Sequence, residues 1–264
     1  MVSSKDRAWN EIFKQLDIHS HDFSKEPFKL TAKEIKKICS IFSETGEREP
    51  RIICYQAERK DRPQLFVDKG LFLLPTKNGH YSIIETTSQS DGYIDIPEIT
   101  SEPIEHSSKL KFKLRSSEIG NSEMQHVDKA SALGLIDHFC DSGPSFLTIR
   151  GRKYTPDFSF TVGKHPIFTK SVQTEVDAGY EGEYHLTLIE AKNTKVKDIL
   201  IRQLYYPYRQ WSHHTGKDVF VLLFEFKDNM YHFWEFEFTN PNDYMSIKLV
   251  KSARYLIKSD QQDE

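Results

Sequence analysis

The stretch VFVLLFEF, residues 219–226, places apolar side chains on both faces of a β-strand. A strand of this kind lies inside a sheet that is covered on both sides, as the central strands of α/β proteins are. The residues before it fit such a protein, because the strand-like YHLTLIEAK at 184–192 is followed by a helical stretch at about 196–213. This strand–helix–strand order predicts a right-handed crossover between two strands. We therefore expect an α/β sheet flanked by helices.

Charge and cysteine content narrow the class of protein. The 264 residues carry a net charge of −3, so a nucleic-acid-binding protein of this composition must concentrate its positive charge locally. Three cysteines without a C-x-x-C pair are typical of a reducing compartment. No apolar stretch approaches the roughly 18 residues of a membrane span, and the charged N-terminus lacks the apolar core of a secretory signal. We expect a cytoplasmic protein with no membrane segment.

Residues 86–108 are rich in Ser, Thr, Glu and Pro, which predicts a surface connection and a domain boundary. We place an N-terminal module at 1–115 and a second domain at 116–264. The module begins with a helix at 5–16 and a second helix capped by Thr31, with Glu34 in capping-box position. Four strand-like pieces follow: RIICYQ, QLFVD, LFLLP and HYSIIE. Helices followed by a small hairpin sheet could form a winged-helix-like α+β module.

The segment KLKFKLR, residues 109–115, alternates basic and apolar side chains. As a strand it would present Lys109, Lys111, Lys113 and Arg115 on one face. Two interpretations remain open: a half-buried strand with a solvated face, or a basic ridge along a phosphate backbone.

The second domain has a regular order of predicted elements. A helix at about 121–140 precedes the strands FLTIR and DFSFTV, and residues 163–183 form a loop-rich insertion. After the crossover come DVFVLLFEF and the alternating YHFWEFEF.

Glu190 and Lys192 are the strongest chemical signal. They lie two residues apart at the end of an apolar strand, so they share a face and are costly to desolvate without partners. Asp157 lies on the preceding predicted strand. If these strands pair, two carboxylates and one ammonium converge, which suits Mg²⁺ bound with a substrate phosphate. The alternative for Pro156-Asp157 is an ordinary turn.

Pro156-Asp157 together with Glu190-Ala191-Lys192 resembles the motif of the PD-(D/E)xK nuclease superfamily, and the similarity covers about 120–226. The order helix, three strands, helix, strand is also similar to that family's core. The resemblance implies a restriction-endonuclease-like mixed sheet flanked by helices. It further implies Mg²⁺ held by Asp157, Glu190 and the Ala191 carbonyl, with Lys192 positioning or deprotonating the attacking water. The separate N-terminal module looks like that of a type II restriction endonuclease, a sequence-specific enzyme.

Two further positions resemble the family's accessory residues. Members often carry an acid on the first core helix, where Glu123 is the candidate; the alternative is an acid that complements the helix dipole. Gln203 resembles the helix glutamine of the RecB-like branch, although Pro207 stands where that branch has tyrosine. Its neighbour Arg202 could hold a phosphate.

The expected partner is double-stranded DNA. The polar stretch YQAERKDRPQ carries Arg59, Lys60 and Arg62, which could read base edges or form a solvated turn. A homodimer would match a palindromic site. Two alternatives remain open: another nuclease of the same superfamily acting in repair or recombination, or a DNA-binding module whose acids are structural.

Overall fold

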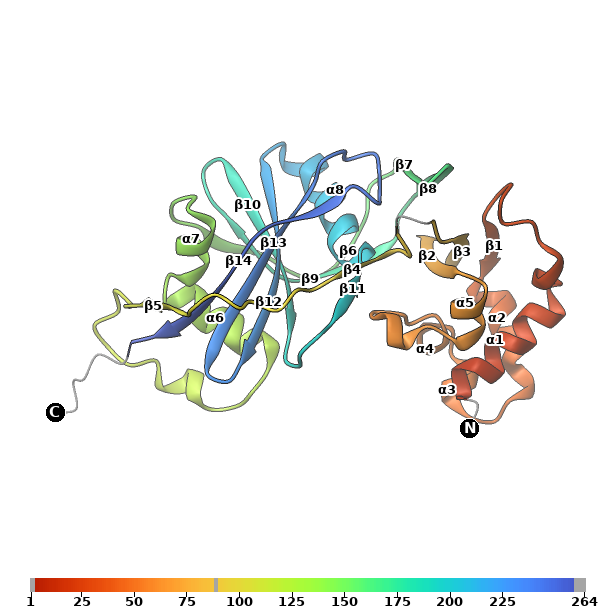
Figure 1. Ribbon diagram of the computed structural model, residues 1–264, viewed down its shortest axis with the longest axis horizontal. Coiled ribbons are helices and arrows are strands. Elements are labelled where there is room, and N and C mark those ends of the chain that lie inside the picture. Colours follow the sequence, from red (N-terminus) through yellow and green to blue (C-terminus); the bar gives the residue numbers. More distant parts are fainter. Residues whose placement is uncertain (1–2, 88–89, 259–264) are drawn as a thin grey trace.

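The computed structural model describes residues 3–87 and 90–258. Figure 1 shows an elongated molecule, with the N-terminal helices and a small sheet at one end and a large sheet with its helices at the other. In these described ranges no helix is both long and apolar enough to cross a membrane.

The N-terminal module combines short helices with a three-stranded antiparallel sheet of order β1-β3-β2. The predicted capping box is confirmed, because the Thr31 side chain accepts from Glu34 N and the Glu34 carboxylate accepts from Thr31 N. The module has its own core around Trp9, whose indole Nε1 donates to Ile53 O over 3.0 Å. Its elements are α1 (Ser4–Gln15), β1 (Phe28–Thr31), α2 (Ala32–Ile38), α3 (Thr45–Arg48), α4 (Pro50–Ile53), α5 (Gln64–Asp68), β2 (Leu71–Lys77) and β3 (His80–Glu85).

Two of the four predicted strands in this module are wrong. The first three residues of RIICYQ lie in α4 and the rest in a loop, and QLFVD forms α5. Pro50 occupies the first turn of α4, where its fixed φ favours a helix. Each piece buries one side only, through Ile53 and Phe66, which a single helical turn achieves without a strand partner. The strands LFLLP and HYSIIE are confirmed as β2 and β3.

The second part of the chain is built on a seven-stranded mixed sheet of order β5-β14-β13-β12-β10-β9-β6. The central position of β12 and its parallel pairing with β10 are as predicted, with α8 as the crossover. The elements are β4 (Tyr93–Asp95), β5 (Ile104–His106), α6 (Glu123–Ala132), α7 (Leu135–Cys140), β6 (Phe146–Tyr154), β7 (Phe158–Val162), β8 (His165–Thr169), β9 (Gln173–Glu181), β10 (His185–Lys192), β11 (Asp198–Leu200), α8 (Arg202–Thr215), β12 (Asp218–Lys227), β13 (Met230–Phe238) and β14 (Ile247–Ile257).

Helices cover both faces of this sheet, as the apolar β12 requires. Val127 and Ala130 of α6 pack with Leu222 and Phe224 on one face. Leu204 of α8 packs on the other face, in the same cluster as Val221 and Leu223. The chemistry-bearing end of β10 therefore lies between α6 and α8.

The predicted insertion at 163–183 is wrong, because these residues form β8 and β9. DFSFTV, as β7, pairs with β8 in a separate two-stranded sheet and not with the large one. That hairpin faces the N-terminal module: Lys170 N donates to Thr76 O over 3.0 Å, and Phe160 shares a core with Phe72. Burial against the module explains the apolar side chains that suggested a central strand.

Other predicted boundaries also shift. The helix predicted at 121–140 is two helices, separated at Gly134, whose φ is +76°. The crossover helix begins at Arg202 instead of about 196 and runs through Pro207 without a break. The strand predicted at 109–115 is absent; the segment is irregular, and its four basic side chains are exposed. Among the described residues, no strand pairs with this segment.

The link between the two parts pairs with the second one. β4 pairs with β11, and β5 pairs in parallel with β14 at the edge of the large sheet. Residues 93–106 were placed with the N-terminal module by the predicted division at residue 115. Their strand partners nevertheless lie beyond residue 115.

Candidate active site

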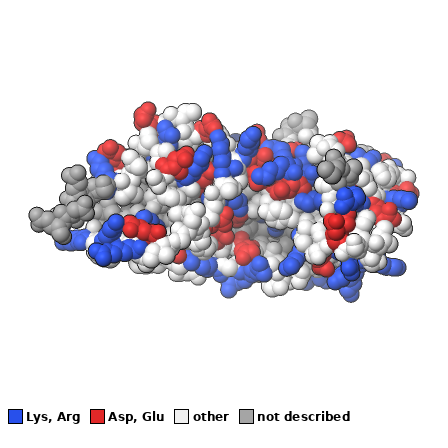
Figure 2. All heavy atoms as spheres, turned by 90° about the horizontal axis from the view of Figure 1, so that it is seen from below, with Lys and Arg blue, Asp and Glu red and all other residues white. Residues whose placement is uncertain are grey.

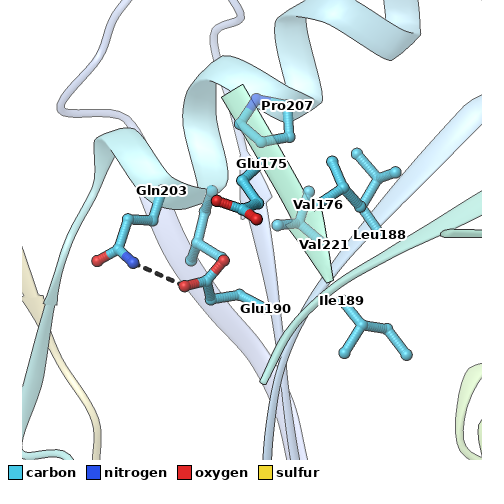
Figure 3. Close-up of a pocket in the computed structure, with 9 residues that line it drawn as sticks. Glu175, Val176, Leu188, Ile189, Glu190, Gln203, Pro207 and Val221 are labelled. Carbon is cyan, nitrogen blue, oxygen red and sulfur yellow. Dashed lines mark hydrogen bonds between the residues drawn. The ribbon is translucent and has the colours of Figure 1, made fainter. Parts of the chain in front are cut away.

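Glu190 and Lys192 end strand β10, and their shared face is confirmed. Lys192 Nζ donates to Glu190 Oε1 over 2.5 Å, and Gln203 Nε2, from the first turn of α8, donates to the same oxygen over 2.6 Å. Figure 3 shows Gln203 reaching down from α8 to the Glu190 carboxylate. Glu175 of β9 lines the same small cavity. The site is thus a small cavity between α8 and the sheet, in which Glu175, Glu190 and Gln203 lie among apolar side chains.

Asp177 is the second carboxylate of the site. It lies on β9, the antiparallel neighbour of β10, and its Oδ2 accepts from Ala191 N over 2.7 Å. The ladder between the two strands ends with the pair Ile189 and Ala178, so Asp177 comes next, opposite Glu190. Asp177 therefore occupies the place that Asp157 was predicted to fill.

Asp157 is not part of this group. It precedes β7, is half exposed, and pairs with Lys170 Nζ at 2.9 Å. The strand next to β10 is β9, not β7, so the predicted pairing was wrong. Pro156-Asp157 belongs to the irregular stretch that leads into the β7–β8 hairpin, and it forms no turn there.

Glu123 does reach the end of β10. It is the first residue of α6, and its Oε1 accepts from Asn193 N over 3.0 Å. Asn193 Nδ2 in turn donates to Asn121 O over 2.9 Å. The start of α6 is thereby tied to the residue that follows Lys192. Glu123 stands beside the site, whether it serves the helix dipole or a bound cation.

The electrostatics of the site are dominated by burial. Burial raises the pKa of the Glu190 carboxyl to about 7, although Lys192 opposes the shift. Burial also raises the pKa of Asp177, against the hydrogen bond from Ala191 N. For Lys192, burial lowers the pKa, but Glu190, Asp177 and Glu123 outweigh it and the net shift is upward. One lysine thus faces three carboxylates in a poorly solvated place.

These residues offer oxygen atoms of the kind that a hard divalent cation takes. Both hydrogen bonds to Glu190 use Oε1, and Gln203 Oε1 is buried without a partner among the described residues. Carboxylate and carbonyl oxygens are the ligands that Mg²⁺ takes. Within residues 3–87 and 90–258, no three acidic, His or Cys side chains are grouped closely enough to form a ready metal cluster. Asp177, Glu190 and the Ala191 carbonyl are the candidate ligands.

Charge on the surrounding surface is mixed. In Figure 2, carboxylates gather near the middle of the face seen from below, with Lys and Arg side chains on both sides of them. Arg202 opens α8 next to Gln203, and its charge acts on Glu190. Lys109, Lys111 and Lys113 are exposed on the irregular segment before α6, and Lys113 pairs with Glu118 at 3.0 Å.

Two predicted DNA contacts need correction. Arg59 is bound to Asp91 at 2.6 Å and Asp95 at 2.5 Å, and Arg62, only 10% exposed, lies 3.4 Å from Asp91. Both guanidinium groups belong to the N-terminal module, and their carboxylate partners lie beyond residue 90. The ion pairs therefore hold the module against the chain that follows it. Lys60 remains exposed, beside Glu58.

The sequence held a signal for Asp177 that the apolar pattern of DFSFTV obscured. QTEVDAGYE alternates from Gln173, and only Gly182, Glu183 and Tyr184 separate it from HLTLIEAK. Two strands joined by three residues that include glycine indicate a hairpin. That hairpin puts Asp177 across from Glu190.

Two family models match the chain. The one described as domain of unknown function DUF6997 covers residues 88–256. The one described as domain of unknown function DUF6996 covers residues 6–83. No curated protein and no solved structure matches the chain.

Proposed function

The chain belongs to the DUF6997 family, and we propose that it is a Mg²⁺-dependent endonuclease that hydrolyses phosphodiester bonds in double-stranded DNA. The observation that carries this function is the convergence of Asp177, Glu190 and Lys192 at one end of two paired strands. An acid, an acid and a lysine in this arrangement suit metal-assisted attack of water on a phosphate.

The order of elements supports the same function. With α7, the β7–β8 hairpin and the short β11 set aside, helix α6, strands β6, β9 and β10, helix α8 and strand β12 follow in the order that the resemblance to PD-(D/E)xK nucleases implies. In that comparison Asp177 takes the position of the motif aspartate, and Pro156-Asp157 is not part of the motif. We infer a restriction-endonuclease-like core with one inserted hairpin.

Each residue of the site has a distinct role in this proposal. Asp177 and Glu190 hold the cation, with the Ala191 carbonyl as a third oxygen. Gln203 fixes the Glu190 carboxylate from α8, and Ala191 N fixes Asp177. The cation would supply water activation and charge neutralisation at the phosphate. Lys192 offers a positive charge and N–H donors to the phosphate or the water.

The N-terminal module supports DNA as the partner. Its order of helix, strand, helices and two strands, with the sheet order β1-β3-β2, is similar to a winged helix. We propose that this module contributes sequence preference, as in a type II restriction endonuclease, and that a homodimer cuts both strands. A cytoplasmic location accords with these roles.

The test is cleavage of supercoiled and linear DNA by the purified chain with Mg²⁺, with Mn²⁺ and with EDTA. We expect cleavage with either metal and none with EDTA. Discrete fragments from a long unmethylated DNA would indicate a restriction enzyme, whereas preferential cutting of branched DNA would indicate a repair or recombination nuclease. Absence of cleavage with both metals would contradict the nuclease function.

A non-catalytic DNA-binding module is the second candidate. It is favoured by the direct ion pair between Lys192 and Glu190, in which the lysine neutralises the acid without a cation. Metal-independent binding of duplex DNA with no cleavage would identify this alternative.

A further inference from the structure

A loop of the N-terminal module rests against the segment that joins the two halves of the active site. Leu200 N donates to Ala57 O over 2.9 Å, and Arg59 N donates to Asp198 Oδ1 over 2.6 Å. Asp198 and Leu200 belong to β11, which lies between Lys192 and Gln203 in the chain. Movement of this loop relative to the catalytic residues is therefore restricted.

Tyr55 projects outward from that loop. Its side chain is 59% exposed, whereas the next residue, Gln56, is 3% exposed. Lys5 Nζ donates to Tyr55 O over 2.6 Å, and Tyr93 OH donates to Gln56 O over 3.1 Å. The backbone is held on both sides of the residue. A rigid loop thus presents a large exposed aromatic side chain.

The surroundings of the Tyr55 hydroxyl connect it to the catalytic residues. Burial raises the pKa of Tyr55, Asp61 raises it further, and Lys192 lowers it while Glu190 raises it. The geometry agrees: Ala57, two residues after Tyr55, accepts from Leu200 N, and Leu200 lies three residues before Gln203, which contacts Glu190. The phenol keeps its proton at neutral pH and can donate it. No described residue accepts a hydrogen bond from its hydroxyl, which leaves this donor available to a ligand.

We propose that Tyr55 is a substrate-contacting residue, and that its hydroxyl donates a hydrogen bond to a DNA phosphate beside the one that is cleaved. The N-terminal module would then form one wall of the active site. Tyrosine hydroxyls commonly bind backbone phosphates, and a contact of this kind fixes the register of the duplex. This contact rests on the proposed nuclease function.

The variants Tyr55→Phe and Tyr55→Ala test the contact, with Tyr184→Ala as a matched control. Tyr184 is 74% exposed in the turn between β9 and β10, at the opposite end of β10 from Lys192. Affinity for a fluorescent duplex is measured by anisotropy in EDTA. Cleavage of the same duplex is measured with Mg²⁺ and with Mn²⁺, and thermal unfolding shows whether each variant is folded.

Both Tyr55 variants should weaken duplex affinity and raise KM by roughly tenfold, because a hydrogen bond to a charged group is lost. Their kcat should stay within about twofold of wild type, since the contact is made equally in the bound and transition states. Tyr184→Ala should match wild type. Wild-type affinity and KM in Tyr55→Phe would overturn the hydrogen bond, even if Tyr55→Ala is impaired, because the ring alone would then matter.

Failure of the nuclease function has a separate signature. If the wild-type chain binds the duplex but cleaves none with either metal, the nuclease function is wrong. In that case the affinity of Tyr55→Phe by itself decides whether the phosphate contact exists. If the wild-type chain does not bind duplex DNA, both proposals are overturned.

Discussion

Lys192 carries its proton at neutral pH, because the carboxylates around it outweigh the effect of burial on its pKa. A charged lysine cannot remove a proton from water, so of the two roles that the motif implies for Lys192, positioning the water is the one that remains. Its 2.5 Å contact with Glu190 has a further consequence. A cation that binds Glu190 must share this carboxylate with the ammonium group or displace it.

The assignment of Asp177 to the site, in place of the predicted Asp157, is directly testable. Asp177→Asn should reduce cleavage at least roughly a hundredfold, because loss of a ligand costs more than loss of its supporting hydrogen bond. Asp157→Asn is the matched control, since this half-exposed acid pairs only with Lys170 among the described residues. Single-turnover cleavage at saturating protein separates the two. Equal loss in both variants would contradict the assignment.

The raised pKa of Glu190 predicts a pH-dependent metal affinity. A metal binds the ionised carboxylate, and Glu190 holds its proton up to about pH 7. Affinity for Mn²⁺ should therefore fall about tenfold for each pH unit below that value and level off above it. Calorimetric titration between mildly acidic and mildly alkaline pH measures this slope. In Glu190→Gln the remaining weak binding should lose most of the slope; an unchanged slope would place the titrating group elsewhere.

Among the elements, β11 has an importance that its three residues do not suggest. It pairs with β4 and directly precedes α8. Its position therefore fixes where α8 begins and where Gln203 lies. Arg59 bonds Asp95 of β4 and lies 3.6 Å from Asp198 of β11. The arginine thus stabilises this two-stranded pair from the side of the N-terminal module.

Removal of this arginine should loosen the pair. Arg59→Ala leaves the partly buried Asp198 without its cation and Asp91 with Arg62 alone, which should cost on the order of 1–3 kcal/mol of unfolding free energy. Lys60→Ala, at the exposed neighbouring position, should cost less than about 0.5 kcal/mol. Urea unfolding compares the two variants. A similar small effect in both would show that the arginine network contributes little.

The elements that the sequence predicted well are those whose pattern of residues identifies the element without reference to a neighbouring strand or helix. The apolar β12, the alternating β13 and the Thr31 cap each signal their state without knowledge of a partner. Short apolar runs do not. Whether QLFVD becomes a turn of helix or a strand depends on whether a neighbouring strand is available, and sequence pattern does not provide that.

In the candidate site, too, some residues were predictable from local sequence patterns and one depended on tertiary packing. Glu190, Lys192 and Gln203 could be found because they flank one predicted crossover. Asp177 was missed because DFSFTV has a stronger strand pattern than QTEVDAGYE, although β7 owes its apolar side chains to the N-terminal module. The choice between two candidate neighbours of β10 depends on tertiary packing and not on local preference.

The whole molecule has a core that crosses its middle. Phe72, Leu74 and Ile84 of the N-terminal module are fully buried in one cluster with Phe160 and Tyr206. Tyr206 OH also donates to Pro75 O over 2.8 Å. Buried apolar surface of this kind contributes roughly 25 cal/mol per Å², so the two parts stabilise each other.

Truncation should reveal this dependence. A chain of residues 116–264 lacks β4 and β5 as well as the module, so we expect it not to unfold cooperatively. A chain of residues 88–264 keeps both strands and should fold, but with a lower midpoint and more exposed apolar surface. Calorimetry and dye binding measure these effects. Unfolding of the 116–264 chain at the temperature of the intact protein would contradict the shared core.

The shared core also limits how the N-terminal module and the second part of the chain can be exchanged between relatives by recombination. A chimera that takes its N-terminal module from a relative imports new residues at positions 72, 74 and 84, while Phe160 and Tyr206 come from the recipient. Such a hybrid folds stably only if those five side chains still pack together. Modules of this family should therefore be inherited together with their β7–β8 hairpin, and a successful graft would transfer both.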